Sequence, residues 1–335
     1  MQVAAVLGKG LAGLVERPDP QPKGGFVVVK VLSAPLCTEY TSFREGAVGH
    51  VHGHEAAGEV VAVDQPGKVK VGDRVVVMPQ YPCGECALCR GGDYIHCEHN
   101  LDVPALMGDS AATATMAQYL VKQDWLLIPV PEGLGLDHAS MACCGLGPTY
   151  GALRLMDARP GETVLIVGLG PVGLGGVINA LDRGCEVIGV DVEPYRLRLA
   201  ETLGAKATLR ADDTDLLGRI RELTGGLGAD KTIRCTPAPG TQLLAMEATR
   251  RKGQVAFVGW GGDVPVNTLL AKGLTLHGAW HYNLADAEGL MQVIQRNGHQ
   301  IDRLITHTFP LRRIQDAWEL QLTGQCGKVV LHPWE

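Results

Sequence analysis

The fold of this chain can be inferred from the segment Thr163-Val-Leu-Ile-Val-Gly168-Leu-Gly170-Pro-Val-Gly173. A short run rich in β-branched residues leads into G-x-G-x-x-G and then into a segment that can be helical, which predicts the strand–turn–helix of a dinucleotide-binding unit. Gly168 permits the tight turn, Gly170 lets the backbone approach a pyrophosphate, and Gly173 lets the helix pack close to the strand. The helix N-terminus at Pro171-Val172 is then expected to face the phosphates with unpaired N–H groups.

A second predicted strand, Glu186-Val-Ile-Gly-Val-Asp191, ends in an acidic residue. It lies about 20 residues beyond the glycines, which is the spacing expected for a carboxylate that binds the adenine ribose. A carboxylate there hydrogen-bonds the ribose diol and repels a 2′-phosphate. Asp191 therefore predicts NAD, rather than NADP, as the cofactor.

The uncharged run from Thr163 to Leu181 has an alternative interpretation, because it is nearly long enough to span a membrane. Several glycines and Pro171 interrupt the run, and the charged residues Glu162 and Asp182 border it directly. This pattern favours a buried strand and helix of a globular protein, so we expect no membrane association.

Length and composition restrict the class of protein. A chain of 335 residues predicts about two domains, each with its own core. The net charge of −6 gives no electrostatic footprint for nucleic acid. The first residues lack the basic start and the apolar core of a signal peptide, and we expect a cytoplasmic enzyme. In that compartment ten cysteines indicate metal binding rather than disulfides.

The first domain contains residue types that bind metals, Cys37 and, further along, His54. Zinc prefers a thiolate and an imidazole, and the adjacent Glu55 can tune or orient such a site from behind the ligands. Each residue alone is typical of a core or loop position, so the prediction depends on the combination. His50 and His52 are expected to be solvated loop histidines rather than a second metal site.

Four cysteines close together give the most specific signal: Cys83, Cys86, Cys89 and Cys97. Four thiolates can close a tetrahedral zinc site that leaves no open position for chemistry. An iron–sulfur cluster is the competing interpretation, because C-x₂-C-x₂-C also begins the ferredoxin pattern. The spacing to the fourth cysteine is longer here and no proline follows it, which favours structural zinc. Metal binding would stabilise a loop that cannot fold alone.

These features together resemble the zinc-dependent medium-chain dehydrogenase/reductase superfamily of alcohol, polyol and sugar dehydrogenases. The resemblance covers essentially the whole chain and rests on the cysteine segment, the G-x-G-x-x-G turn, Gly53-His-Glu-Ala-Ala-Gly58, Val71-Gly-Asp-Arg-Val75 and Gly253-Gln-Val-Ala-Phe-Val-Gly259. It implies an α/β fold with a GroES-like, β-rich catalytic domain and a doubly wound Rossmann domain. The implied bounds are 1–146 for the catalytic domain with a zinc lobe at 81–100, 147–283 for the Rossmann domain, and 284–335 for a return to the catalytic domain.

A catalytic zinc needs three protein ligands and an open fourth position, and alcohol dehydrogenase uses two cysteines and a histidine. Cys37 and His54 match the first two ligands of the family. In relatives the third lies six residues before a tyrosine or similar residue, and counting back from Tyr150 gives Cys144. Cys143 is the alternative, and the cysteine that does not bind metal is expected in the core.

The residues after Cys37 depart from the family pattern, which is usually Gly or Arg, then Ser or Thr, then Asp. Here they are Thr38, Glu39 and Tyr40. The position that usually begins the proton relay is therefore Glu39. Three possibilities follow: Glu39 accepts the proton, Thr38 reaches in instead, or Glu39 approaches the metal.

The second domain offers further cofactor contacts that the resemblance implies. Arg196 matches a basic residue that contacts the adenine ribose, and an exposed helix arginine is the alternative. Val258 ends a predicted strand, Val255–Val258, at the sheet edge where ligands bind in doubly wound folds. Trp280 follows the segment that resembles the last Rossmann strand, which lines the nicotinamide. Trp260 and Trp280 either shape the pocket or pack in the core.

The sequence thus predicts a zinc-dependent oxidoreductase that transfers a hydride between a small alcohol and NAD, with two zinc ions per chain. The polar residues Glu39, Tyr40 and Ser42, in a chain with four phenylalanines, favour a polyol, sugar or cyclitol as substrate. A simple secondary alcohol is the alternative substrate. A non-catalytic dinucleotide-binding or redox-sensing protein is the rival from another class. Analogy with relatives implies a homodimer or homotetramer.

Overall fold

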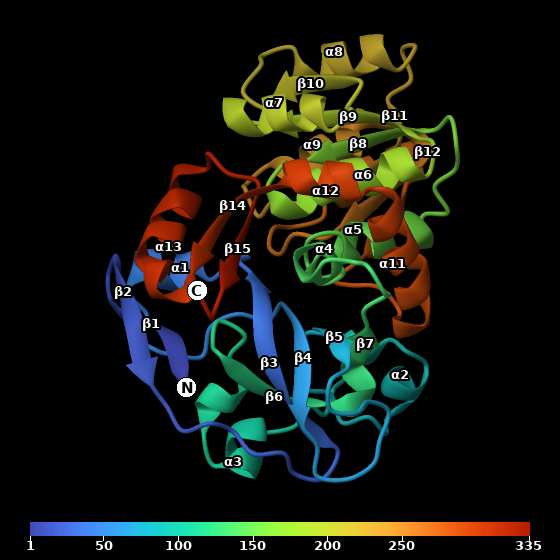
Figure 1. Ribbon diagram of the computed structural model, residues 1–335. Coiled ribbons are helices and arrows are strands. Elements are labelled where there is room, and N and C mark those ends of the chain that lie inside the picture. Colours follow the sequence, from blue (N-terminus) through green and yellow to red (C-terminus); the bar gives the residue numbers. More distant parts are fainter. The chain divides into compact units, whose positions relative to one another are not determined.

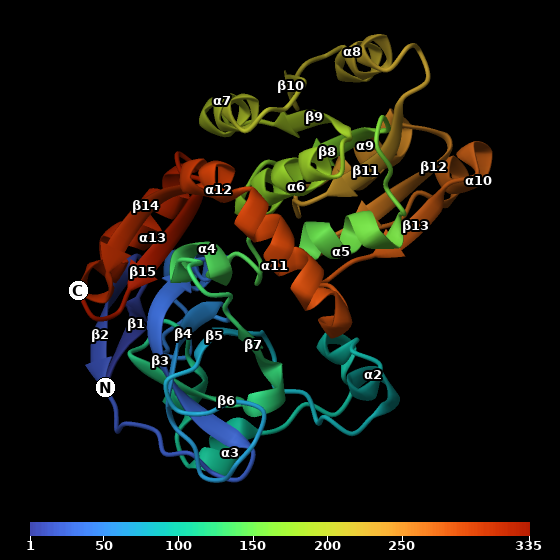
Figure 2. The same cartoon turned by 45° about the vertical axis from the view of Figure 1, so that its right-hand side comes forward.

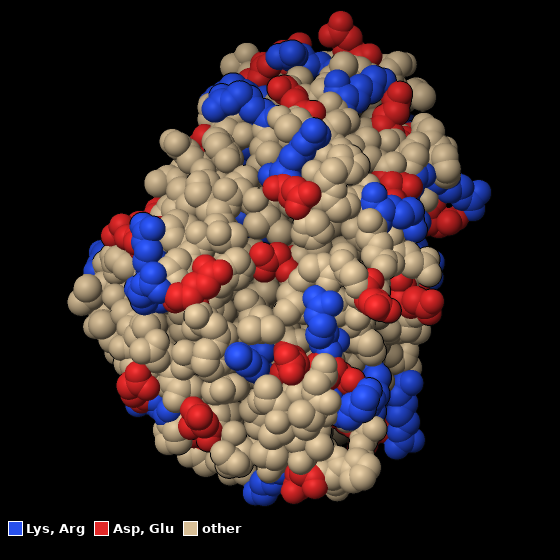
Figure 3. Space-filling view, viewed as in Figure 1, with Lys and Arg blue, Asp and Glu red and all other residues tan.

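The computed structural model describes residues 1–335 (Figures 1 and 2). Contacts divide the chain into two compact units. The first unit comprises Met1–Cys144, Asn283–Gln295 and Ile305–Glu335, and the second Gly145–Tyr282 and Arg296–Leu304. None of the helices has the length and apolar character that a membrane crossing requires. Basic and acidic side chains are interspersed on the face that Figure 3 shows.

The first unit is built on a seven-stranded sheet with the order β14-β15-β3-β4-β5-β7, and β6 pairs with β3. The strands are β3 (Phe26–Pro35), β4 (Ala56–Ala62), β5 (Arg74–Val77), β6 (Tyr119–Gln123), β7 (Leu127–Pro129), β14 (Ile305–Pro310) and β15 (Lys328–His332). Strand β3 pairs antiparallel with β4, β6 and β15, so it joins the start of the chain to its end. Most of its side chains are buried, because both of its faces are covered.

The remaining elements of this unit are a hairpin, six helices and five short 3₁₀ turns. A hairpin consists of β1 (Gln2–Gly8) and β2 (Leu11–Glu16). The helices are α1 (Tyr40–Glu45), α2 (Ala87–Arg90), α3 (Val103–Met107), α4 (Leu136–Ser140), α11 (Ala287–Arg296) and α13 (Ile314–Thr323). Short 3₁₀ turns lie at Tyr94–His96, Ser110–Thr113, Asp124–Leu126, Leu284–Asp286 and Leu311–Arg313. Trp318 of α13 is fully buried in the core and packs against Phe43 of α1.

The second unit is a six-stranded parallel sheet with the order β10-β9-β8-β11-β12-β13. The strands are β8 (Thr163–Val167), β9 (Glu186–Asp191), β10 (Ala207–Arg210), β11 (Ala229–Arg234), β12 (Thr249–Phe257) and β13 (Thr275–Gly278). The strand order reverses between β8 and β11, which is the switch point at which doubly wound folds bind ligands. The predicted α/β class with a parallel Rossmann sheet is confirmed.

Helices cover both faces of this sheet. They are α5 (Gly147–Leu155), α6 (Pro171–Asp182), α7 (Pro194–Thr202), α8 (Leu216–Leu223), α9 (Thr241–Ala248), α10 (Val266–Lys272) and α12 (Gly298–Leu304). Residues of α8 and α9 share one core cluster with Leu165 and Val167. Ile166, which lies between them in β8 and faces the other side of the sheet, packs against Gly173 and Gly176 of α6. Helix α12 belongs to this unit, where Gln300 donates to the carbonyl of Leu203.

The glycine turn between β8 and α6 has the geometry that the sequence predicts. Gly168 has a φ of 94°, which L side chains rarely adopt. A Cβ added to Gly173 would lie 1.9 Å from the carbonyl oxygen of Gly168. Neither position accommodates a side chain, so the chain can pass directly from the strand into the helix.

Strand β12 begins at Thr249, six residues earlier than the predicted start at Val255. The early part, Arg250–Gly253, is polar and its register against β11 shifts between Ala229 and Lys231. Lys252 there has a φ of 60°. An irregular polar segment of this kind carries no alternation of apolar residues, which is why the pattern did not predict it.

Lys122 of β6 is buried without a carboxylate partner. Its Nζ donates to the carbonyl of Gln80 and lies 3.9 Å from the ring centroid of Tyr81. Burial lowers the pKa of Lys122 from 10.5 to about 7. Between these values the unfolded chain binds more protons than the folded chain, so this residue makes stability rise with pH.

We therefore expect Lys122→Met to remove part of this pH dependence. The free energy of unfolding is measured in urea at pH 7 and at pH 9.5. The variant should exceed the wild type in this free energy by more at pH 7 than at pH 9.5. Lys9→Met, at an exposed position, is the matched control. A difference between variant and wild type that is the same at both pH values would contradict the assigned pKa.

Candidate active site with two metal-ligand clusters

The four lobe cysteines converge on one point. Their sulfurs lie within 4.8 Å of one another, with Sγ–Sγ distances of 3.4 Å for Cys86–Cys89, 3.6 Å for Cys83–Cys97 and 3.9 Å for Cys83–Cys89. A tetrahedral zinc with bonds of about 2.3 Å requires sulfurs about 3.8 Å apart. The sulfurs therefore fit a single ion, whereas an iron–sulfur cluster would need to separate them further.

Hydrogen bonds support this lobe, some from its own backbone and some from a residue outside it. The N–H groups of Glu85 and Cys86 donate to the sulfur of Cys83, and they lower the pKa of that thiol to about 6. Outside the lobe, Asn283 donates from Nδ2 to the carbonyl of Gly91 at 2.7 Å. A Cβ on Gly92 would overlap the Asn283 amide, so the contact requires a glycine.

The second cluster consists of Cys37, His54, Glu55 and Cys144, whose ligand atoms also lie within 4.8 Å of one another. Cys37 follows the end of β3 and His54 precedes the start of β4. These strands pair antiparallel, with Ser33 opposite Ala57, so the end of β3 and the start of β4 lie side by side and bring Cys37 and His54 together. Cys144 comes from the turn after α4. All four residues belong to the first unit.

Glu39 holds the imidazole of His54. Its Oε1 lies 2.8 Å from Nδ1 of His54, and its Oε2 accepts from the N–H of Cys37 at 2.9 Å. Burial opposes ionisation of this carboxyl, but the charge of His54 and its hydrogen bond outweigh burial and bring the pKa of Glu39 to about 2. With Nδ1 engaged, Nε2 is the ring nitrogen left for a metal.

Glu55 lies behind the ligands in a buried ion pair. Neither Glu55 nor Lys328 has an exposed side chain, and Lys328 Nζ donates to Glu55 Oε1 at 2.6 Å. Glu55 Oε2 accepts from the N–H of Cys144 at 3.1 Å. Burial alone would lower the pKa of Lys328, but Glu55 and Cys37 raise it, so the lysine remains charged. Sequence reasoning missed Lys328, which carries no motif and meets Glu55 only through the pairing of β15 with β3.

The two adjacent cysteines have different surroundings. Cys144 joins the ligand cluster, whereas the sulfur of Cys143 donates to the carbonyl of Val77 at 3.2 Å and is not exposed. Burial raises the pKa of Cys143. Hydrogen bonds from Cys144 and His54 lower the pKa of Cys37 against the effect of burial. A second residue that the sequence did not reveal, Gln321, donates to the carbonyl of Cys37 at 3.2 Å.

The other histidines of this loop have partners elsewhere. His52 pairs through Nε2 with the carbonyl of Gly49 at 3.0 Å, and His50 contacts Arg17 and Ser110. Neither belongs to a metal-ligand group. Thr38, next to Cys37, is exposed.

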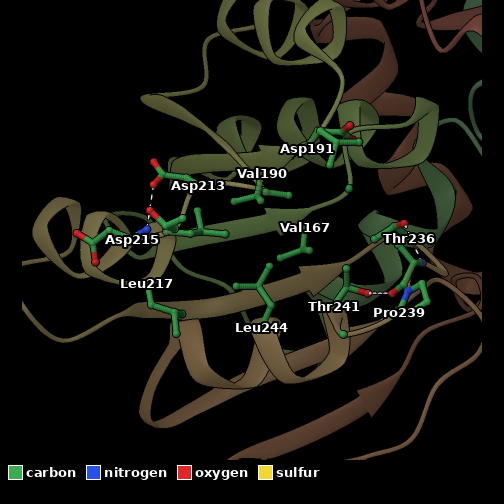
Figure 4. A pocket seen from close by; sticks show the side chains of 17 residues that line it. Val167, Val190, Asp191, Asp213, Asp215, Leu217, Thr236, Pro239, Thr241 and Leu244 are labelled. Atoms are coloured by element: carbon green, nitrogen blue, oxygen red, sulfur yellow. Dashed lines mark hydrogen bonds between the residues drawn. The ribbon is translucent and has the colours of Figure 1, made fainter.

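A cavity of about 580 Å³ opens at the switch point of the second unit (Figure 4). Gly168 and Asp191 line it, and Val167, Val190 and Leu244 lie across its middle. Asp191 is 7% exposed, and its oxygens accept from the N–H groups of Leu169 at 2.6 Å and Glu193 at 2.9 Å. Each oxygen keeps a lone pair for a ribose hydroxyl.

The other predicted cofactor residues do not line this cavity. Arg196 is half-buried on α7, and its Nε is buried without a partner. Val258 follows β12, and its N–H donates to the carbonyl of Arg234. Trp260 and Trp280 form an edge-to-face pair with ring centroids 5.2 Å apart. Trp260 is 70% exposed, so it is not a core residue.

A sheet-rich unit with a Cys₄ and a Cys₂His cluster, joined in one chain to a doubly wound unit, defines the class of zinc-dependent medium-chain dehydrogenases. The model of the alcohol dehydrogenase GroES-like domain matches residues 23–132, and that of the zinc-binding dehydrogenase matches residues 171–296. The chain is 31% identical to the uncharacterized zinc-type alcohol dehydrogenase-like protein YphC of Escherichia coli, over 99% of this chain and 98% of the relative. The chain therefore belongs to the zinc-type alcohol dehydrogenase family.

Other relatives match over nearly the whole length. The sorbitol dehydrogenase of Bacillus subtilis is 29% identical, over 94% of this chain and 92% of the relative. The solved structure of an alcohol dehydrogenase from Thermus sp. ATN1 superposes with a TM-score of 0.89 at 26% identity, and the match covers 99% of both chains. Family and ligand clusters together support zinc as the metal.

The two clusters predict a metal content that substitution can separate. We expect two zinc ions per chain in the wild type and one in both Cys97→Ser and Cys144→Ser, measured by atomic emission on the purified protein. Cys97→Ser should also lower the melting temperature, because lobe zinc stabilises its own loop. Cys185→Ser is the control and should keep two zinc ions, because the thiol of Cys185 is buried and donates a hydrogen bond to the carbonyl of Arg159. Loss of zinc from Cys143→Ser instead of Cys144→Ser would reverse the ligand assignment.

Proposed function

We propose that this protein is an NAD-dependent dehydrogenase that interconverts a secondary alcohol and a carbonyl, with a polyol, sugar or cyclitol as the preferred substrate. The observation that carries this proposal is the convergence of Cys37, His54 and Cys144 with an imidazole oriented by Glu39. This is the donor set of catalytic zinc in alcohol dehydrogenase, with three protein ligands and an open position.

The residues around the cluster prepare it for a cation. Cys37, Cys144 and Nε2 of His54 would hold zinc, which supplies Lewis-acid polarisation of an alcohol oxygen when bound. Glu39 fixes the tautomer of the imidazole through Nδ1. Glu55 fixes the backbone of Cys144 and is itself neutralised by Lys328. The buried pair therefore adds no net charge to the site.

The proton that leaves the alcohol needs an acceptor, and Glu39 is poorly placed for this role. Both of its oxygens already have partners, the imidazole of His54 and the N–H of Cys37. Thr38 precedes Glu39, is exposed, and has no hydrogen bond from its hydroxyl within the chain. We therefore assign the relay to Thr38 and the orientation of His54 to Glu39.

The cofactor follows from Asp191 at the end of β9. A ribose diol can add its hydroxyls to the two carboxylate oxygens, whereas a 2′-phosphate would meet the negative charge of Asp191. Asp213 and Asp215 line the same cavity and add to this repulsion (Figure 4). These charges support NAD, which accepts the hydride when bound.

The substrate class is supported by the relatives. They include sorbitol dehydrogenase at 29% identity and L-threonine 3-dehydrogenase of Bacillus subtilis at 30% identity, over 96% of this chain. Sorbitol and L-threonine are polar molecules with secondary hydroxyl groups. We infer that this chain also takes a small polar alcohol.

A screen of polyols, cyclitols and simple secondary alcohols with NAD and NADP, followed by absorbance of the reduced cofactor, tests this proposal. We expect kcat/KM with NAD to exceed that with NADP roughly 100-fold, because like charges in contact cost several kcal/mol. Asp191→Ser should lower the ratio of kcat/KM with NAD to kcat/KM with NADP. A preference for NADP would contradict the role of Asp191, and cofactor binding without turnover of any alcohol would favour a non-catalytic binder.

Substitution next to Cys37 separates the relay from the ligand support. We expect Thr38→Ala to lower kcat about 100-fold and Thr38→Ser to restore most of it, with zinc content unchanged. Glu39→Gln should instead weaken zinc affinity roughly 10- to 100-fold. The opposite pattern, with a loss of zinc in Thr38→Ala and a pure kcat effect in Glu39→Gln, would return the relay to Glu39.

A further inference from the structure

Arg234, the last residue of β11, is a buried cation without an acidic partner. It is 1% exposed and forms no ion pair with a carboxylate. Its Nε donates to the hydroxyl of Thr241 at 2.9 Å. Burial of an unpaired guanidinium is unfavourable unless other acceptors surround it, so the acceptors that do so are an essential part of this site.

The other acceptors of Arg234 are backbone carbonyls of one loop. Nη1 of Arg234 donates to the carbonyl of Gly259 at 2.8 Å and to that of Gly261 at 3.1 Å, and it lies 3.4 Å from the carbonyl of Trp260. Three successive carbonyls can face one cation only if the loop folds back on itself. Gly261 has a φ of 83°, which provides this turn.

A second buried donor holds the same loop from α9. Nε2 of Gln242, which is 6% exposed, donates to the carbonyl of Gly261 at 2.8 Å. The fit is close, since a Cβ on Gly262 would overlap the Gln242 amide. The loop Gly259–Gly262 thus has fixed carbonyls although it follows β12 at the surface.

The side chain in the middle of this loop points the other way. The carbonyl of Trp260 faces the buried guanidinium, whereas its side chain is 70% exposed at the carboxyl edge of the parallel sheet. There it packs against Trp280, which lies just beyond the end of β13. Ligands of doubly wound sheets bind at this edge. The same guanidinium contacts Thr241, which begins α9 and lines the cavity that contains Asp191 (Figure 4).

We propose that Arg234 is a positioning residue that fixes the Gly259–Gly262 loop, so that Trp260 forms a wall for the nicotinamide half of the cofactor. This inference rests on the proposed function, because it requires a dinucleotide. Arg234 acts through the loop and has no contact with the reacting atoms. The adenosine half depends on it less, since Thr241 also donates to the carbonyl of Ala238 at 2.5 Å.

The test compares two probes, NADH and AMP, by isothermal titration calorimetry on the zinc-loaded protein. We expect Arg234→Met to weaken NADH binding at least tenfold and to leave AMP binding within twofold of wild type. Arg234→Lys should recover part of the NADH affinity, because it keeps the charge but not the fork of donors. Melting temperature and zinc content check that each variant is folded.

Trp260→Ala keeps the inference testable if Arg234→Met fails to fold, because an exposed side chain contributes little to stability. It should also lose NADH affinity and keep AMP affinity. The inference would be overturned if Arg234→Lys and Trp260→Ala both bound NADH with wild-type affinity. It would also be overturned if the variants lost equal affinity for NADH and for AMP. Failure of the wild type to bind NADH would instead contradict the proposed function.

Discussion

A buried ion pair between Glu55 and Lys328 connects the chain segments that form the second cluster of possible metal ligands. Glu55 follows the proposed ligand His54, accepts from the backbone of the proposed ligand Cys144, and pairs with a lysine in the last strand. Removal of either partner would leave a buried charge, which costs about 3–5 kcal/mol. Three segments that are distant in sequence are therefore held at one point.

Around this pair, hydrogen bonds from other residues also hold the proposed ligands. Glu39 orients His54 and the backbone of Cys37, and Gln321 of α13 holds the carbonyl of Cys37. Such supports fix ligand geometry before metal arrives, and this lowers the entropy lost on binding. The lobe cysteines differ, because their supports are mainly backbone N–H groups of the lobe itself.

The sequence predicted the local features well and the long-range ones poorly. The glycine turn, the acid that ends β9 and the lobe cysteines are patterns within a few residues, and the structure places them as the patterns indicate. Lys328 and Arg234 belong to ordinary strands and acquire their partners only through sheet pairing and loop packing. The partners of Glu39 were equally hidden, because side-chain hydrogen bonds leave no periodic trace in a sequence.

The proposed function requires Cys37, His54 and Cys144 to bind one metal ion. Diffraction from crystals of the zinc-loaded protein, recorded at X-ray energies just above and just below the zinc absorption edge, would locate this ion. We expect two anomalous peaks per chain, one among the lobe cysteines and one between the sulfurs of Cys37 and Cys144 and a ring nitrogen of His54. A single peak in the lobe, with the other three side chains unligated, would contradict it.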